Sequence, residues 1–323
     1  MIKKIAHISD IHIRKAHSRN DEYKQVFENL LLSLQNVKPH RIAITGDYVN
    51  DYLDLQGEQL VLGSWFLNEL AKIAPVRITR GNHDYRKTSS SRIDSVDAIT
   101  QSISNPNIKF LNETGFVEDD NIVWSVWKHG EPKNNPWLKD KKYVKLEDKI
   151  YIDLFHETVN GSVNDNGIEN NSPTNVSLSE MKGDFVFLGH IHKEQIFNKD
   201  KKSKIPFAAY AGSLICQKFD EGDDNFHGYL LWDVENKSIE EIKITSDYTW
   251  KNVQVNQFTD YDDLDIDIDD VSKYMRVRIN WKTLPAQRTK DNERKVVKYI
   301  RDKYSESEIT IVNINKWCIF VMS

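Results

Sequence analysis

Val76-Arg77-Ile78-Thr79-Arg80-Gly81-Asn82-His83-Asp84 is the stretch that decides the fold, because a short apolar strand runs here directly into a polar turn. Taken alone, Gly-Asn-His-Asp could be an ordinary turn. Four further signals of this kind follow predicted strands: Asp10-Ile11-His12, Gly46-Asp47, His156-Glu157 and Gly189-His190-Ile191-His192. Functional residues of parallel sheets lie beyond the carboxyl ends of the strands, so we expect the five signals to share one site.

The N-terminal part alternates between apolar strands and amphipathic helices. We expect strands at 3–9, 41–45 and 75–80 and helices at 22–38 and 57–73. In the first helix, apolar residues recur every three or four positions from Val26 to Val37, which gives one apolar face. This alternation predicts an α/β fold with a parallel sheet and right-handed crossovers.

The rest of the chain predicts more strands, a long loop and a second domain. We expect a loop and a short helix within 86–105, strands at 108–111, 121–127, 149–155, 184–188, 206–213 and 228–234, irregular structure at 128–148, a long loop at 157–180 and a lysine-rich hairpin tip at 198–204. The acidic run 260–270 reads as a linker. A strand at 273–281, a basic amphipathic helix at 289–304 and one or two strands at 308–322 follow. We therefore expect domains at 1–250 and 251–323.

Composition limits the compartment and the partners. The chain has 323 residues, 39% apolar and 29% charged, with a formal net charge of −5. A nucleic-acid partner would therefore need local basic patches and bound cations. Two distant cysteines, Cys216 and Cys318, favour a reducing cytoplasm, bacterial or that of a phage-infected host. No secretory segment and no apolar run of about 18 residues occurs, so no membrane association is expected.

The side chains of the five signals are donors to divalent metals. Asp10 and His12 share one side of an extended strand end, and His190 and His192 repeat that spacing. Carboxylate, carboxamide and imidazole together suit Mn²⁺, Fe²⁺ or Zn²⁺, and the lack of thiolates argues against structural zinc. An aspartate such as Asp47 can bridge two metals about 3.5–4 Å apart.

The remaining polar residues of the signals suggest acid–base roles. His83 is the natural general acid or stabiliser of transition-state charge, and Asp84 could orient it. The other histidines have plainer interpretations. We expect His7 in the core or behind the site, and His40, His129 and His227 at the surface or in turns.

These signals resemble the calcineurin-like metallophosphoesterase superfamily over residues 3–235. The resemblance implies a two-sheet α/β sandwich, in which the later strands build a second sheet on the first. It also implies a site for two divalent ions, Mn²⁺ first and Mg²⁺, Fe²⁺ or Zn²⁺ as alternatives. One metal would be held by Asp10, His12, Asp47 and His192, and the other by Asp47, Asn82, His156 and His190.

A second signature resembles one branch of that superfamily. Tyr210-Ala211-Gly212-Ser213, Phe219-Asp220-Glu221 and Gly228 to Asp233 are similar to a stretch of SbcD-type and meiotic-recombination nucleases, phage relatives included. The C-terminal unit fits their small α/β DNA-capping domain in position and size. The resemblance implies a DNA exonuclease or endonuclease for repair and recombination, an SbcC-like coiled-coil ATPase partner and a homodimer.

Two departures from that branch keep alternatives open. Gly46-Asp47-Tyr48-Val49-Asn50-Asp51 lacks the substrate-positioning histidine that nuclease relatives often carry there, though Asn50 or Asp51 could serve. Relatives usually continue into helices that grip the ATPase, and we expect that element to be absent, shortened or replaced here. A small-molecule or cyclic-nucleotide phosphodiesterase or phosphatase is the main alternative, and a non-catalytic scaffold is a third.

Candidate DNA contacts are basic residues in loops. The loops that start at the metal signals have the better claim, and the hairpin tip is a further candidate. The residues are Arg14, Lys15 and Arg19; Arg86, Lys87 and Arg92; and Lys199, Lys201, Lys202 and Lys204.

Overall fold

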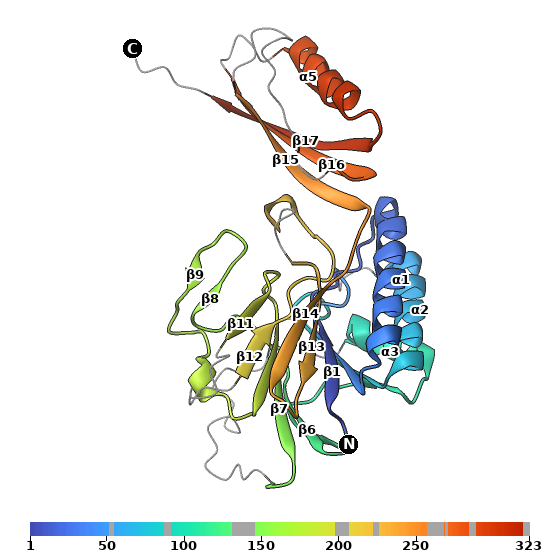
Figure 1. Cartoon of the computed structure of the whole chain (residues 1–323), viewed down its shortest axis with the longest axis vertical. Coiled ribbons are helices and arrows are strands. Elements are labelled where there is room, and N and C mark those ends of the chain that lie inside the picture. Colours follow the sequence, from blue (N-terminus) through green and yellow to red (C-terminus); the bar gives the residue numbers. More distant parts are fainter. Residues whose placement is uncertain are drawn as a thin grey trace. The chain divides into compact units, whose positions relative to one another are not determined.

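The chain divides into two compact units (Figure 1). The computed structural model describes residues 1–51, 55–86, 92–130, 146–197, 207–221, 226–256, 268, 271–283 and 289–318. Unit 1 comprises Met1–Ile215 and Phe226–Thr245, and unit 2 comprises Cys216–Asn225 and Ser246–Ser323. The boundary expected after residue 250 falls inside the strand β15 (Tyr248–Asn256) of unit 2.

The first sheet of unit 1 carries the predicted parallel strands. Its order is β14-β13-β1-β2-β3-β4. The strands β1 to β4 are parallel, β13 is antiparallel to β1, and β14 is antiparallel to β13. The strands are β1 (Lys4–Ile8), β2 (Arg41–Thr45), β3 (Val76–Thr79), β4 (Ile108–Phe110), β13 (Gly228–Asp233) and β14 (Ser238–Lys243). Thus β13 returns to the first sheet, whereas the sequence placed the later strands in a second one.

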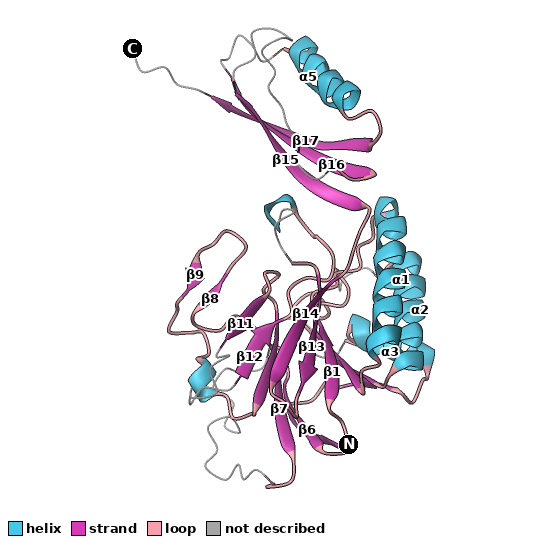
Figure 2. Ribbon diagram, in the orientation of Figure 1, coloured by secondary structure: helices cyan, strands magenta, loops and turns pink. Residues whose placement is uncertain are grey.

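Three helices pack on the outer face of this sheet (Figure 2). They are α1 (Asn20–Val37), α2 (Gly57–Ile73) and α3 (Ser95–Ile103). The apolar stripe of α1 is buried, and Phe27 stacks on Phe66 of α2 with ring centroids 3.7 Å apart. Lys38 adopts a left-handed conformation and Pro39 follows, so α1 ends there.

The second sheet faces the inner side of the first. Its order is β11-β12-β10-β7-β6-β5, built from β5 (Gly115–Asp119), β6 (Ile122–Trp127), β7 (Ile150–His156), β10 (Phe185–Gly189), β11 (Gln195–Phe197) and β12 (Phe207–Tyr210). The core between the sheets includes Ile5 and Trp232 of the first sheet and Trp124 and Phe187 of the second, all fully buried. Each such side chain contributes roughly 1.5–3 kcal/mol. The predicted two-sheet sandwich is confirmed.

Unit 2 is a small α/β layer. The strands β15, β16 (Tyr274–Thr283) and β17 (Glu308–Cys318) form a parallel sheet, and α5 (Lys290–Lys303) packs on one face. Thr289 caps α5 by accepting a bond from the Asn292 amide at 3.1 Å. In the part of the chain that the structure describes, no helix is long and apolar enough to cross a membrane.

Several elements differ from the sequence expectations. The strands β5, β11, β14 and β15 were not predicted, and the expected loop 157–180 contains a two-stranded sheet of β8 (Ser162–Val163) and β9 (Glu169–Asn170). Most of the irregular segment 128–148, the lysine-rich tip and all of the acidic linker except residue 268 lie outside the described residues.

The carboxylate of Asp119 ties the two sheets together. It lies at the end of β5 and is 9% exposed. From the first sheet, Arg41 donates to it at 2.9 and 2.7 Å and Arg77 at 2.8 Å. The Trp124 indole nitrogen of β6 donates at 3.0 Å. Burial raises the pKa of Asp119, but the donors and the two positive charges outweigh it and lower that pKa to about 2.

Asp119→Asn should lower the free energy of unfolding by about 3 kcal/mol at pH 7, because it leaves two guanidinium groups without their counter-charge between the sheets. Chemical denaturation followed by tryptophan fluorescence measures this. Asp120→Asn is the matched control. The Asp120 side chain is 52% exposed and pairs with the N-terminal amine at 2.9 Å, so the loss should stay below about 1 kcal/mol.

The pH dependence of this difference has a defined sign. The folded-state pKa of Asp119, about 2, lies below the value of about 3.9 for an unfolded aspartate. Its contribution is therefore complete above pH ~4 and is lost as the pH falls towards about 2. The stability gap between wild type and Asp119→Asn should close over this range, and a constant gap would contradict the ion-pair assignment.

Candidate metal centre

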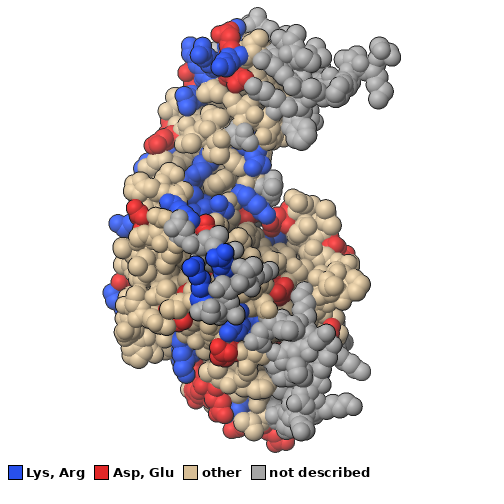
Figure 3. Space-filling view, turned by 180° about the vertical axis from the view of Figure 1, so that it is seen from behind, with Lys and Arg blue, Asp and Glu red and all other residues tan. Residues whose placement is uncertain are grey.

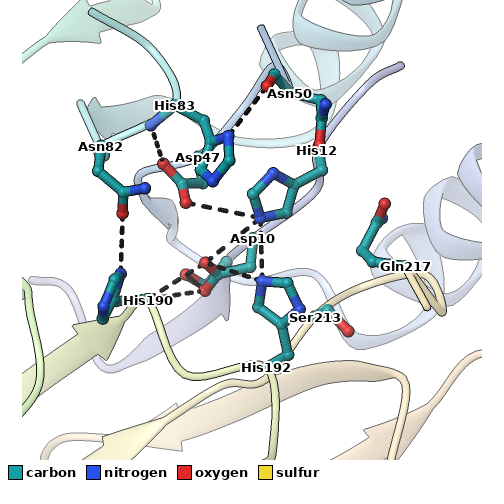
Figure 4. A network of polar contacts seen from close by, with 12 residues as sticks. Asp10, His12, Asp47, Asn50, Asn82, His83, His190, His192, Ser213 and Gln217 are labelled. Carbon is teal, nitrogen blue, oxygen red and sulfur yellow. Dashed lines mark hydrogen bonds and ion pairs between the residues drawn. The ribbon is translucent and has the colours of Figure 1, made fainter. Parts of the chain in front are cut away.

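The five sequence signals meet at the carboxyl edge of the two sheets, as predicted (Figure 4). Asp10 and His12 follow β1, Asp47 follows β2, and Asn82 and His83 follow β3, all in the first sheet. His156 ends β7, and His190 and His192 follow β10, in the second sheet. Residues up to 180 positions apart in the chain thus become neighbours.

One group of donors consists of Asp10, His12 and His192. Their ligand atoms lie within 4.8 Å of one another. The Nε2 atoms of the two histidines are only 3.0 Å apart, and each is 3.8 Å from an oxygen of Asp10. Figure 4 shows the nitrogen atoms of the two rings facing each other beside Asp10. Two imidazole nitrogens and a carboxylate that converge in this way fit a divalent cation.

A second group consists of Asp47, Asn82, His156 and His190. The Asn82 carboxamide oxygen lies 3.3 Å from His156 Nε2 and 2.8 Å from His190 Nδ1. One oxygen of Asp47 lies 3.3 Å from His156 Nε2 and 3.5 Å from His12 Nε2. Asp47 therefore stands between the two groups. The donors fit two divalent ions that share this carboxylate.

The buried carboxylates of the centre favour a positive charge close to them. Burial lowers the pKa of His156, but the carboxylates of Asp47 and Asp10 outweigh it and raise that pKa to about 10. Burial acts to raise the pKa of Asp47, but the neighbouring histidines lower it overall. Burial and His156 lower the pKa of His190 to about 4. The buried carboxylates thus retain a proton on His156, and a divalent cation would replace it.

Three glycines give the donors room to converge. A Cβ atom on Gly81 would lie 2.2 Å from Asp47 Oδ1 and 2.6 Å from His156 Nε2. On Gly46, at φ +85°, it would lie 2.5 Å from His156 Nδ1. On Gly189 it would lie 2.1 Å from the Thr45 carbonyl. A side chain at any of these positions would displace the donors.

The backbone of the donors is itself unusual. Asp10, His12 and Asp47 have φ near +50° and His190 has φ of +96°. A left-handed conformation costs a non-glycine residue on the order of 1 kcal/mol. Hydrogen bonds from the surrounding fold offset this cost. The His190 amide donates to both oxygens of Asp10 at 3.1 and 3.0 Å, and His156 Nδ1 donates to the Thr45 carbonyl at 2.6 Å. Thr45 in turn bonds the fully buried His7, which lies behind the centre as expected.

His83 lies beside both donor groups. Its amide donates to Asp47 at 2.8 Å, and its ring stands edge-on to His12 with centroids 4.7 Å apart. Nδ1 lies 2.9 Å from the Asn50 carbonyl (Figure 4). A carbonyl only accepts, so Nδ1 carries the proton and Nε2 is left for other chemistry.

Asp84 does not orient His83, so that prediction is wrong. The Asp84 carboxylate is fully buried and accepts bonds from the amides of Gly81, Tyr48 and Val49 at 2.8, 3.3 and 3.0 Å. It therefore holds the turns after β2 and β3 together. Burial raises its pKa to about 7, while these amide donors oppose the shift. The orienting group of His83 is a backbone carbonyl, which sequence cannot reveal.

The Tyr210 to Ser213 signature supports the metal centre from behind. The Tyr210 hydroxyl donates to the Glu157 carbonyl at 2.8 Å, next to His156. The Ser213 amide donates to the His192 carbonyl at 2.9 Å. Gly212, at φ +74°, lets the two loops approach, since a Cβ there would lie 2.8 Å from that carbonyl. The signature thus fixes two donor-bearing loops.

The basic loop residues differ in accessibility. Arg19 is 4% exposed and donates to Glu22 at 2.8 and 3.0 Å, so its assignment as a DNA contact is wrong. Lys15 pairs with Asp51 at 3.0 Å. Arg14 is half-buried and close enough to lower the pKa of His12, after the larger effect of burial. Arg86 and Arg92 are exposed, whereas Lys87 and the lysines at 199–204 lie outside the described residues.

The sequence interpretation also missed His129. It was expected in a surface turn, but it is 5% exposed and lies against His156. It shares a signal with the donors, because it follows a buried apolar strand, Ile122–Trp127, and precedes a glycine. That signal could have placed it at the centre.

Gly81→Ala should weaken Mn²⁺ binding at least tenfold, because the new methyl group occupies the space between Asp47 and His156. Isothermal titration calorimetry measures the affinity. Gly57→Ala, at the start of α2, has no atom within 4 Å of the new Cβ and should bind as wild type does. Equal affinity in both variants would contradict the described geometry.

The chain is similar to a protein of viral origin. An uncharacterized protein of Acanthamoeba polyphaga mimivirus is 33% identical over 267 residues, which is 79% of this chain and 19% of that protein. The chain thus spans about a fifth of the length of this relative.

The chain is also similar to two solved structures and matches one family model. The phosphoesterase YfcE of E. coli matches at 17% identity and a TM-score of 0.36, covering 75% of this chain and 100% of its own. GAP50, described as the anchor in the inner membrane complex of Plasmodium, matches at 8% identity and a TM-score of 0.40, covering 75% and 89%. The sequence model of the calcineurin-like phosphoesterases matches residues 3–194, more than half of the chain. The chain therefore belongs to the calcineurin-like phosphoesterase family.

Proposed function

We propose that the chain is a Mn²⁺-dependent nuclease that hydrolyses phosphodiester bonds of DNA at this centre. The observation that carries the proposal is the position of Asp47 between two donor groups, with His83 against them. A bound pair of divalent ions would clamp a phosphoryl group and activate a water molecule. The chain itself has to deliver a proton to the leaving oxygen.

His83 is suited to deliver that proton. The Asn50 carbonyl fixes the ring through Nδ1, so Nε2 is the nitrogen that can carry a proton to the substrate. The hydrogen bond from the His83 backbone N–H to the Asp47 carboxylate holds His83 beside the centre. Among the described residues, no carboxylate forms a hydrogen bond with the ring, and Asp84 accepts from three backbone amides instead.

A basic groove on unit 2 supports a polyanionic substrate. Lys290, Arg294, Lys298 and Arg301 recur at helical spacing on one stripe of α5, and all four are exposed. They line a groove of about 450 Å³ with Val297 and Ile314, together with Glu293 and Asp302. No ion pair involves these four cations within the described ranges. At about 1.5 Å per residue, the stripe is roughly 16 Å long, enough to follow several phosphates.

Basic side chains also gather elsewhere on the molecule. In Figure 3, blue side chains cluster over the middle of the view, with few red ones among them. We propose the α5 groove as a binding surface because its basic residues line a cavity.

We further propose a role for the chain in DNA repair or recombination. The resemblance of Tyr210 to Asp233 and of unit 2 to SbcD-type nucleases supports a role in DNA repair or recombination. It also supports an SbcC-like ATPase partner, a homodimer and a cytoplasmic location. A small-molecule or cyclic-nucleotide phosphodiesterase is the second candidate, favoured by the negative net charge and by the burial of Arg19.

His83→Ala should lower the rate of Mn²⁺-dependent cleavage of linear duplex DNA by about 10²–10⁴-fold, because the leaving oxygen loses its proton donor. Gel analysis of end-labelled DNA measures the rate. Mn²⁺ affinity should remain within a few-fold of wild type, and a large loss would make His83 a metal ligand instead. His40→Ala, an exposed histidine, is the matched control.

The same preparation separates the two candidate functions. Cleavage of DNA supports the nuclease. Turnover of a cyclic nucleotide or of bis-p-nitrophenyl phosphate, with intact DNA, would instead support the small-molecule enzyme. Absence of both activities, with and without a partner ATPase, would leave the scaffold interpretation.

Replacing Arg294 and Lys298 together by glutamate should weaken binding of duplex DNA and reduce the slope of log K against log salt by about 2, because about two phosphate contacts are lost. Fluorescence anisotropy in EDTA measures binding without cleavage. Lys72→Glu with Lys295→Glu gives the same charge change at two ion-paired surface lysines outside the groove. Equal weakening in both double variants would mean that only net charge matters.

A further inference from the structure

His129 occupies the wall of the metal centre without belonging to its donors. It follows β6 in the second sheet and is 5% exposed. The ring stands edge-on to the rings of His156 and Tyr85, with centroids 5.7 Å away in each case. It is thus packed among aromatic rings beside the second donor group.

The ring of His129 holds the backbone of a metal donor. Nδ1 lies 2.7 Å from the His156 carbonyl and 2.9 Å from a carboxylate oxygen of Glu157. Both partners accept, so Nδ1 carries a proton and shares it between them. The Tyr210 hydroxyl binds the next carbonyl, that of Glu157, at 2.8 Å. Two successive carbonyls at the end of β7 are therefore fixed by side chains.

The other ring nitrogen shows that packing alone does not explain this residue. Nε2 of His129 is buried and has no hydrogen-bond partner in the part of the chain that the structure describes. An orphaned buried nitrogen is unfavourable, and a phenylalanine would fill the same space without it. The N–H group at Nδ1, and not the volume of the ring, therefore accounts for a histidine at this position.

The backbone of His129 is bound to the other half of the centre. Its carbonyl accepts bonds from Arg80 Nε at 3.1 Å and Nη2 at 2.8 Å. Arg80 immediately precedes Gly81 and Asn82, stacks on Tyr85 at 3.9 Å and pairs with Asp94 at 3.1 Å. His129 therefore joins the strand end that carries Asn82 in the first sheet to the strand end that carries His156 in the second.

We propose that His129 is a positioning residue that sets the affinity of the second metal position, formed by Asp47, Asn82, His156 and His190. The first position should not depend on it, because the hydrogen bonds and ion pairs of His129 among the described residues join it to Arg80, His156 and Glu157 and not to Asp10 or His12. The inference rests on the two-ion centre proposed above, but not on DNA as the substrate.

The test is a Mn²⁺ titration of each variant. Calorimetry measures the binding steps, and the electron paramagnetic resonance signal measures free Mn²⁺. Wild type should bind two ions. His129→Phe keeps the ring volume but removes the donor, and should weaken one of the two binding steps about 10–100-fold, as loss of a group that supports a ligand commonly does. The other step should stay unchanged.

His129→Asn provides the rescue. Its amide nitrogen lies as many bonds from Cα as Nδ1 does, so it can donate to the His156 carbonyl and should restore most of the weakened step. His40→Phe replaces an exposed histidine and should bind as wild type does. The melting temperature in EDTA reports folding separately, and it should differ little between the Phe and Asn variants.

Three results would overturn the inference: equal weakening of both binding steps, no weakening, or an Asn variant as weak as the Phe variant. A wild-type chain that binds a single ion would instead refute the two-ion function itself. Absence of weakening, the second of these results, would remove the role of His129 and leave the proposed function intact.

Discussion

The carboxylate of Asp47 is the group on which the centre depends. One of its oxygens accepts the His83 amide, and the other lies between His12 and His156. A buried anion is tolerated only if positive charge and donors surround it. The left-handed turns, the glycines that clear space and the histidines from both sheets all serve this requirement. The fold thus concentrates negative charge where a phosphoester hydrolase needs cations.

The sandwich brings the second half of the donors to Asp47. The first sheet supplies Asp10, His12 and Asn82, and the second supplies His156, His190 and His192. The aromatic layer around Phe187 and Trp232 and the Asp119 ion pairs hold the two sheets together. Each of the two donor groups described above takes donors from both sheets, because His192 joins Asp10 and His12, and His156 and His190 join Asp47 and Asn82.

The sequence predicted the centre better than its surroundings, for physical reasons. Donors at strand ends are recognisable because residue type and spacing are local. The strands that were missed, β5, β11, β14 and β15, all lie at sheet edges, where one side is unpaired and polar residues are tolerated. Asp84 and His129 were misread because their partners are backbone groups distant in the chain. Arg19 was misread because its ion pair with Glu22, one helical turn away, and its burial were not anticipated.

The layer of side chains between the sheets has a consequence for ion choice. The donors of each position come from different sheets, so the distance between them follows from the thickness of the apolar layer around Trp124, Phe187 and Trp232. That layer acts as a spacer whose dimension is set by ring sizes rather than by the ligands. Replacing one of these rings by a smaller side chain would change the distance between the ligand atoms of the two sheets. Discrimination among Mn²⁺, Mg²⁺ and Zn²⁺, which differ in preferred ligands and bond lengths, would then become a property of the hydrophobic core.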